Sequence, residues 1–93
     1  MFHKIKCVTA LSAFKLSVQF AEGVTKIYDM EPLVGKLPVF AELKNDPQMF
    51  HCVEVDVGSY GIIWNDDMDL SCDELWENGV TVETPFDGLM ADG

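Results

Sequence analysis

The sequence predicts a single α+β domain, in which an antiparallel sheet of about five strands carries two short helices. Apolar and polar residues alternate in the stretches KLSVQFA (15–21) and CVEVDV (52–57), a pattern typical of strands with one buried face. A glycine-containing turn signal follows each stretch, and helix-start signals mark the segments 38–45 and 72–78. The 93 residues suffice for one small domain.

The opening stretch and the cysteines indicate a cytoplasmic protein. MFHKIKCVTALSAF predicts a strand at residues 4–11 rather than a signal peptide, because its apolar run is short, contains hydroxyl side chains and is followed by Lys15. The three cysteines lack CxxC spacing, so we expect reduced and mostly buried thiols at Cys7, Cys52 and Cys72.

A β-hairpin is expected next along the chain. Glu22-Gly23 offers a two-residue turn between KLSVQFA and VTKIYD, because glycine adopts positive φ without a steric penalty. In this register Val18 faces Ile27. Gln19 then faces Lys26, so apolar residues meet apolar ones and polar residues meet polar ones.

The middle of the chain predicts short helical pieces. MEPLVGKLP contains two prolines and a glycine, which favour a bend with one helical turn at 32–34. Pro38 suits the first position of the helix at 38–45, and Pro47 ends that helix. Leu37, Phe40, Ala41 and Leu43 are expected against the sheet, and a further turn is expected at 48–50.

A second hairpin is expected between CVEVDV and YGIIW. Its inward residues are Val53, Val55 and Val57, and Gly58-Ser59 provides the turn. Three consecutive apolar residues at 62–64 indicate a strand covered on both faces. A turn at 65–67 and a short strand at MDL follow.

The last helix has the clearest start signal. Ser71 followed by Glu74 three residues later matches the capping box, and the acids of the first turn suit the helix dipole. Cys72, Leu75 and Trp76 share one face, and Gly79 is the expected C-cap. The domain is therefore assigned to residues 3–79. The tail at 80–93 is expected to add a strand at 80–83 and to fray after Pro85.

The net charge limits the classes of molecule that we expect to bind the protein. The formal net charge is −10, from 16 acids and 6 lysines, and no Lys or Arg occurs from Asn45 onward. Such a surface repels nucleic acids and anionic lipids, whereas a basic protein would be attracted. No apolar run approaches the roughly 20 residues that cross a bilayer, so no membrane contact is expected.

No catalytic, cofactor or metal site is predicted. Asp67, Asp69, Ser71 and Asp73 alternate like the start of an EF-hand, but Cys72 and Asn78 stand where that loop needs Gly and Glu. His51 and Cys52 are adjacent, so in a strand they point to opposite faces. The sequence has no nucleophile elbow, no G-x-G-x-x-G and no phosphate loop.

Two interpretations of the aromatic and acidic residues stay open. Tyr60, Trp64 and Trp76 form either part of the core between sheet and helix or the lining of a ligand pocket. Together with Asp66 and Asp67 of the acidic turn, they are the candidate surface for a ligand or partner.

The combination of G-x-Y-G-I-x-W at 58–64 with D-L-S-x-D-E-L-W at 69–76 resembles the signature of the domain-of-unknown-function 2442 family. KIKCVTAL, LSVQFAEGVTKIYDMEPL and PVFAELKN also match, so the resemblance covers residues 3–79. It implies a small prokaryotic α+β domain similar to the N-terminal domain of some helix-turn-helix proteins. It also implies that single-domain members are often encoded beside another small protein in a toxin–antitoxin-like arrangement. It implies no activity.

The leading hypothesis is a non-enzymatic protein-interaction or regulatory module, antitoxin-like, whose partner is another small protein with a basic face. Homo-oligomers through a free sheet edge are a further expectation. Only fourteen residues follow Gly79, too few for a helix-turn-helix, so this chain alone is not expected to bind nucleic acid. The alternative is a small-ligand-binding domain with its pocket near Tyr60, Trp64 and Trp76.

Overall fold

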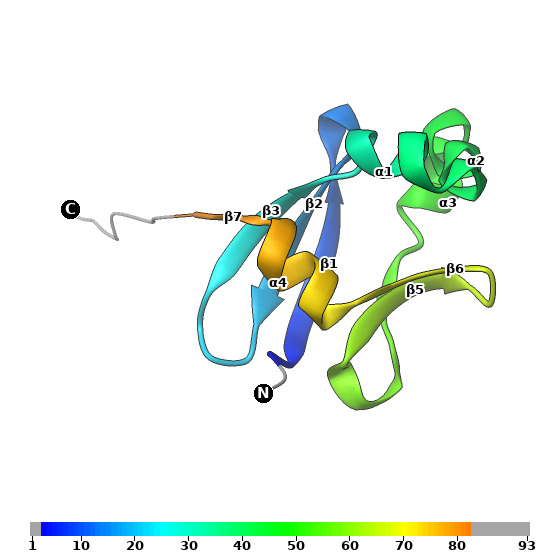
Figure 1. Cartoon of the computed structure of the whole chain (residues 1–93). Coiled ribbons are helices and arrows are strands. Elements are labelled where there is room, and N and C mark those ends of the chain that lie inside the picture. Colours follow the sequence, from blue (N-terminus) through cyan, green and yellow to red (C-terminus); the bar gives the residue numbers. More distant parts are fainter. Residues whose placement is uncertain (1–2, 83–93) are drawn as a thin grey trace.

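The computed structural model describes residues 3–82 as an α+β fold with two antiparallel sheets (Figure 1). One sheet has the order β1-β2-β3-β7, with β1 at Ile5–Leu11, β2 at Lys15–Phe20, β3 at Thr25–Asp29 and β7 at Val80–Thr81. The other has the order β4-β5-β6, with β4 at Glu54–Val55, β5 at Gly61–Asn65 and β6 at Met68–Ser71. The α+β class is confirmed, but the strands are divided between two sheets because the helical middle of the chain separates the two hairpins.

Within residues 3–82, four short helices and three 3-10 turns connect the strands. The helices are α1 (Glu31–Lys36), α2 (Ala41–Asn45), α3 (Pro47–Phe50) and α4 (Cys72–Asn78), and the 3-10 turns are Ser12–Phe14, Pro38–Phe40 and Val57–Ser59. The helix expected at 38–45 is present as a 3-10 turn that continues into α2. Figure 1 shows α1, α2 and α3 gathered at one end, while α4 lies across the four-stranded sheet. No helix in this part of the chain has the length and apolar content to span a membrane.

The register of the β2–β3 hairpin differs by one residue from the expected one. Val18 pairs with Lys26 rather than with Ile27. The loop has three residues, 21–23, and Gly23 at φ 95° takes the left-handed position that such loops require. The shift turns Ile27 away from the core and places Lys26 on the core face, where it is only 9% exposed.

The core lies between the two sheets and the helices. Its fully buried members come from β1, β2, β5, β6, α2 and α4, and from the residue that follows β3: Ile5, Leu16, Val18, Phe20, Met30, Leu43, Ile62, Met68, Cys72 and Leu75. Two residues expected inside are exposed, Leu37 at 48% and Val57 at 95%. Val57 is outside because β4 ends at Val55 and a 3-10 turn begins.

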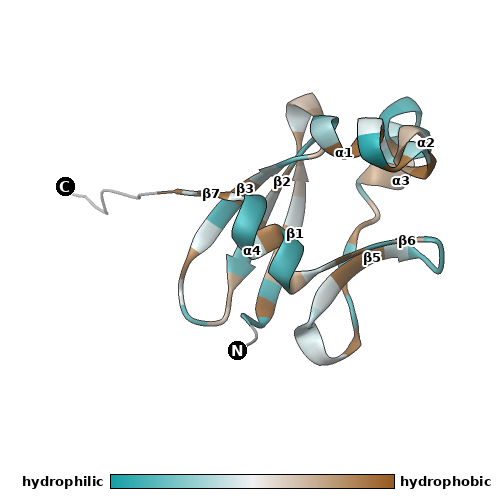
Figure 2. Ribbon diagram, viewed as in Figure 1, coloured by the Kyte–Doolittle hydropathy of each residue, from teal (hydrophilic) through white to brown (hydrophobic). Residues whose placement is uncertain are grey.

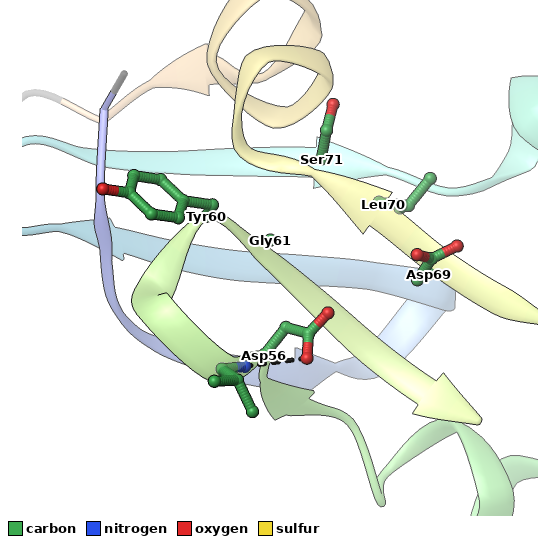
Figure 3. A pocket seen from close by; sticks show the side chains of 7 residues that line it. Asp56, Tyr60, Gly61, Asp69, Leu70 and Ser71 are labelled. Carbon is green, nitrogen blue, oxygen red and sulfur yellow. Dashed lines mark hydrogen bonds between the residues drawn. The ribbon is translucent and has the colours of Figure 1, made fainter. Parts of the chain in front are cut away.

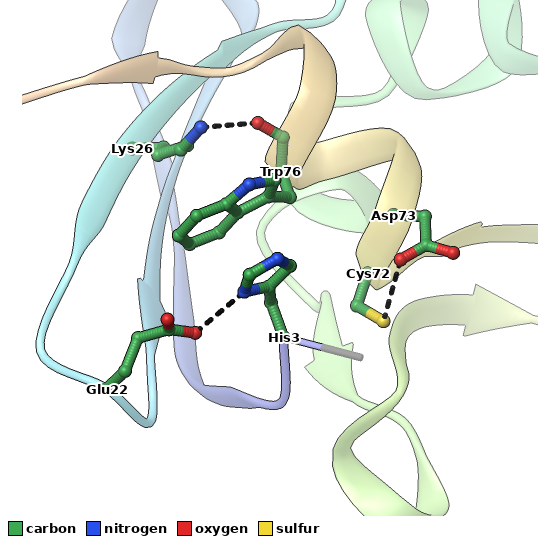
Figure 4. A network of polar contacts seen from close by, with 6 residues as sticks. All are labelled: His3, Glu22, Lys26, Cys72, Asp73 and Trp76. Carbon is green, nitrogen blue, oxygen red and sulfur yellow. Dashed lines mark hydrogen bonds and ion pairs between the residues drawn. The ribbon is translucent and has the colours of Figure 1, made fainter. Parts of the chain in front are cut away.

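Two side chains of β3 hold α4 in place. The Lys26 ammonium donates to the backbone carbonyl of Trp76 and lies 4.2 Å from the centroid of the indole ring (Figure 4). The Tyr28 hydroxyl donates to Glu74 Oε2 at 2.8 Å. Because α4 directly follows β6 and directly precedes β7, these contacts connect the two sheets.

The sequence explains where α4 begins and where it ends, and a different physical cause acts at each end. Ser71 Oγ accepts from the backbone N–H of Glu74 at 3.2 Å, which confirms the predicted cap. Gly79 ends the helix with φ −80°, a value that other residues also adopt, so glycine is not required here for a left-handed conformation. A Cβ at Gly79 would lie 2.6 Å from the Leu75 carbonyl oxygen, and this close approach is what requires glycine.

The strand expected at 80–83 is present as the two residues of β7, which pair with β3. Glu83 and the expected fraying after Pro85 lie outside the described residues.

Ser71→Ala is expected to lower the free energy of unfolding by about 1 kcal/mol, because the N–H of Glu74 loses its acceptor. Urea unfolding at neutral pH measures the change. Ser12→Ala is the matched control, since the exposed Ser12 hydroxyl makes no hydrogen bond within residues 3–82. Equal stabilities of Ser71→Ala and the parent would contradict the capping role.

Tyr28 is expected to make stability fall with rising pH in alkaline solution. Burial raises its pKa far above the ordinary value of 10.0, and the hydrogen bond to Glu74 and that carboxylate's charge raise it further. Above about pH 10 the unfolded chain loses the phenol proton while the folded chain keeps it, so the free energy of unfolding declines. Below that pH both states hold the proton and the effect vanishes.

The measurement is urea unfolding of the parent and of Tyr28→Phe from about pH 8 to about pH 11. The variant should be less stable by about 1 kcal/mol at neutral pH and should lose less stability on going alkaline. All other ionisable groups are present in both proteins, so their contributions cancel in the difference. Parallel stability curves would show that the Tyr28 phenol is not held protonated.

Candidate functional site

A hollow of about 340 Å³ lies on the three-stranded sheet, on the face opposite the core (Figure 3). The paired core residues Ile62 and Leu70 are buried beneath this part of the sheet. The second pair, Gly61 with Ser71, contributes its backbone to the hollow, and a glycine at 61 is required because a Cβ there would lie 2.5 Å from the Leu70 carbonyl oxygen. The lining consists of Asp56, Val57, Tyr60, Gly61, Asp69, Leu70 and Ser71.

The turn before β5 shapes one wall of the hollow. Asp56 accepts from the backbone N–H of Val57 at 2.7 Å and so starts the 3-10 turn. Gly58 at φ 83° and Ser59 at φ 67° then reverse the chain, and the left-handed conformation of a serine is strained. The turn leaves Val57 95% exposed and Tyr60 47% exposed beside the hollow.

Two carboxylates give the hollow its charge. Figure 3 shows the side chains of Asp56 and Asp69 on either side of the Gly61 backbone. The Asp69 carboxylate makes no hydrogen bond and no ion pair within residues 3–82. The ammonium of Lys4 lies 5.3 Å from the Tyr60 ring centroid, but it forms no ion pair with either aspartate. The hollow therefore presents formal negative charge beside apolar side chains.

Of the three predicted aromatic site residues, only Tyr60 lines this hollow. Trp64 stands at the helical end of the core, where its ring stacks on Phe50 with centroids 6.3 Å apart and meets the edge of Phe40 at 6.0 Å. Its indole N–H donates to the Phe50 carbonyl at 3.0 Å. Trp64 is thus a half-buried packing residue with its polar atom satisfied.

Trp76 belongs to a third environment, on α4. Its indole lies between the His3 ring, stacked at 3.5 Å with an interplanar angle of 2°, and the Lys26 ammonium (Figure 4). Phe20 meets it edge-on at 5.0 Å, and Glu22 Oε1 lies 2.9 Å from His3 Nδ1, from which it accepts a hydrogen bond when that nitrogen carries the proton. Because Trp64 and Trp76 lie elsewhere, the structure does not bring the three rings into one pocket.

Asp66 and Asp67 form the β5–β6 turn, a hydrophilic tip in Figure 2. Both are exposed, and neither lines the hollow. The turn is stabilised by Asn65, whose side-chain oxygen accepts from the Asp67 N–H at 2.8 Å. Their role in binding a partner stays a prediction.

Cysteines and metal ligands offer no second site in the described part of the chain. Cys72 is buried, but Cys7 and Cys52 are exposed, which corrects the expectation of mostly buried thiols. Within residues 3–82, no three or more His, Cys, Asp or Glu side chains converge to hold a metal ion.

The sequence indicated part of this hollow. Tyr60 was among the candidate surface residues, whereas Asp69 had been considered only within the EF-hand-like run. The contribution of Asp56 to the hollow was missed, because a strand was expected to continue through Val57. In that strand Val57 would face the core and Asp56 would be an ordinary outward-facing residue. The combination of Asp, Val and Gly before a strand was the available signal, since Asp often caps a turn that glycine completes.

Comparisons with known proteins place the chain in context. A family model described as a protein of unknown function (DUF2442) matches residues 5–81. No curated protein matches the chain. Among solved structures, the crystal structure of the putative DNA binding protein NE0471 from Nitrosomonas europaea ATCC 19718 has a TM-score of 0.71 at 23% identity, covering 84% of this chain and 49% of that chain. This likeness concerns the fold, and the chain spans about half the length of that protein.

Replacing each aromatic side chain by alanine should distinguish the rings that stabilise the fold from the ring at the surface. Trp64→Ala and Trp76→Ala are each expected to lower the free energy of unfolding by about 3 kcal/mol, through lost packing and, for Trp64, a lost hydrogen bond. Tyr60→Ala, the control on the hollow, should cost no more than about 1 kcal/mol. Urea unfolding followed by circular dichroism gives the values. A tryptophan variant as stable as the parent would contradict its packing role.

Proposed function

The chain belongs to the DUF2442 family of proteins of unknown function, and from that premise we propose that it is a non-enzymatic protein-interaction or regulatory module. Its partner is a protein with a basic face. The observation that carries this proposal is the distribution of charge: 16 acids stand against 6 lysines, and all six lysines precede Asn45.

The fold turns this sequence asymmetry into a surface asymmetry. The three-stranded sheet, α4 and the hollow are all built from residues after 45. Acids are exposed on each of these elements or their turns, among them Glu54, Asp66, Asp67, Asp69, Asp73 and Glu77. A field of one sign attracts an oppositely charged protein and raises the rate of its association.

Two of the six lysines are already engaged within the fold. Lys26 is buried against Trp76, and Lys44 pairs with Glu31 at 2.9 Å. Nucleic acids require clustered cations that neutralise several phosphates. The structural relative is described as a putative DNA binding protein, but this chain spans about half of it. We therefore propose that this chain alone does not bind nucleic acid.

The absence of enzymatic activity is part of the proposal. The hollow contains no histidine or cysteine, and its one hydroxyl beside Tyr60, that of Ser71, already caps α4. A nucleophile needs a base within hydrogen-bonding distance. His51 instead bonds to the Pro47 carbonyl at 2.8 Å.

Two finer statements accompany the proposal. The antitoxin-like role is supported by the resemblance to single-domain relatives encoded beside another small protein. The cytoplasmic location is supported by the three free cysteines. Homo-oligomers would use the edge strand β7, beside which Val80 and Val82 are 71% and 38% exposed. Small-ligand binding is the second candidate, because about 340 Å³ falls within the usual range of ligand sites.

The test is co-purification of the chain with the product of the neighbouring gene, followed by an affinity titration in salt. We expect a complex whose affinity falls between about 50 mM and about 300 mM salt, because screening weakens attraction between exposed charges. A mobility-shift titration with duplex DNA and single-stranded RNA at low salt is the control and should show no complex. Tight binding of either nucleic acid, or an acidic stable partner, would overturn the proposal.

A further inference from the structure

We infer that the hollow over Gly61 receives one basic side chain, an arginine or a lysine, from the partner protein, with its cationic head between Asp56 and Asp69. The inference rests on the proposed function and names the place and the chemistry of the contact. Three observations support it: the shape of the hollow, its apolar walls and its uncompensated charge.

The dimensions suit a single long side chain. A hollow of about 340 Å³ that opens to solvent is larger than such a side chain and leaves room for bridging water. Tyr60 and Val57, which are 47% and 95% exposed, provide apolar surface beside the carboxylates. Arginine and lysine combine an apolar stem with a charged head, so the stem can lie on these residues while the head reaches the aspartates.

The two carboxylates of the hollow form no ion pair within the described residues. Asp69 has no polar partner there, and Asp56 accepts one backbone N–H from the residue that follows it. Bringing two carboxylates to one hollow is unfavourable without a cation, and a guanidinium or ammonium would relieve that repulsion through charge-assisted hydrogen bonds. Lys4, over Tyr60, does not do so in this structure.

Val57 extends the contact beyond the hollow. It is 95% exposed at the tip of a turn that a strained serine maintains. An apolar side chain beside a charged pocket matches the pattern of a protein interface, in which apolar contacts exclude water around a desolvated charge pair. A bare metal ion would have no use for Val57 or for the Tyr60 ring.

The experiment is an amide NMR titration of the ¹⁵N-labelled full chain with N-acetyl-arginine amide, with sodium chloride at the same ionic strength as the control. We expect saturable shifts at Val57, Tyr60, Gly61 and Ser71, and none with sodium chloride. Calcium chloride is titrated separately. Tighter saturation of the same amides by calcium would overturn the inference in favour of an ion site.

Asp69→Asn and Asp56→Asn remove one charge each while keeping the shape and, at 56, an acceptor for the turn. Each should weaken arginine-amide binding by about threefold to tenfold. Glu42→Gln on α2 removes an exposed charge outside the lining of the hollow and should change nothing. Equal weakening by Glu42→Gln would show non-specific attraction and overturn the inference.

The same variants in the co-purification assay separate the two proposals. Weaker capture by Asp69→Asn, but not by Glu42→Gln, would support both. A protein complex that forms unchanged with Asp69→Asn would refute the inference and leave the proposed function standing. Specific arginine-amide binding without any protein partner would support the chemistry of the hollow and refute the proposed function.

Discussion

The contact of Lys26 with the last turn of α4 is the constraint on which the arrangement of the two sheets depends. A helix leaves its last carbonyls without intrahelical donors and accumulates partial negative charge there. The seven residues of α4 contain no basic side chain in the last turn. Lys26 supplies both the donor and the charge from the neighbouring strand, and the indole of Trp76 covers its ammonium. Without this lysine, a short acidic helix would have to cross the sheet with an unsatisfied end.

That constraint also explains why an apparently unfavourable register is the native one. The expected pairing would have directed Ile27 into the core and Lys26 outward, a better choice by hydrophobicity alone. The three-residue loop that ends at Gly23 shifts the register by one residue, so that Lys26 faces the core and Ile27 faces away from it. The apolar stem of Lys26 is still buried, and its head reaches the Trp76 carbonyl at the helix end. A rule based on alternation cannot detect this, because the deciding partner lies fifty residues further along the chain.

Features that depend on residues close together in the sequence were predicted correctly. Ser71 and Glu74 define the start of α4 through a bond between residues three apart. Pro38 begins the 3-10 turn that continues into α2, and α2 ends before Pro47, as expected. The hollow and the division into two sheets depend on tertiary geometry instead. The stretch CVEVDV looks like one continuous strand, but Asp56 binds the next amide and ends β4 after two residues. The same event exposes Val57, creates the wall of the hollow and separates Tyr60 from the other two rings.

The sandwich of Trp76 between His3 and Lys26 gives the protein a built-in optical reporter. An imidazole stacked on an indole alters the emission of that indole, and does so differently when the imidazole carries a proton. Trp64 stacks on the Phe50 ring, and its indole N–H donates to the Phe50 carbonyl. Its emission is therefore not affected by a stacked imidazole. The fluorescence of Trp76 is therefore expected to depend on whether the segment that precedes β1 is docked on α4, and with a single-tryptophan variant the docking could be followed in real time without any attached dye.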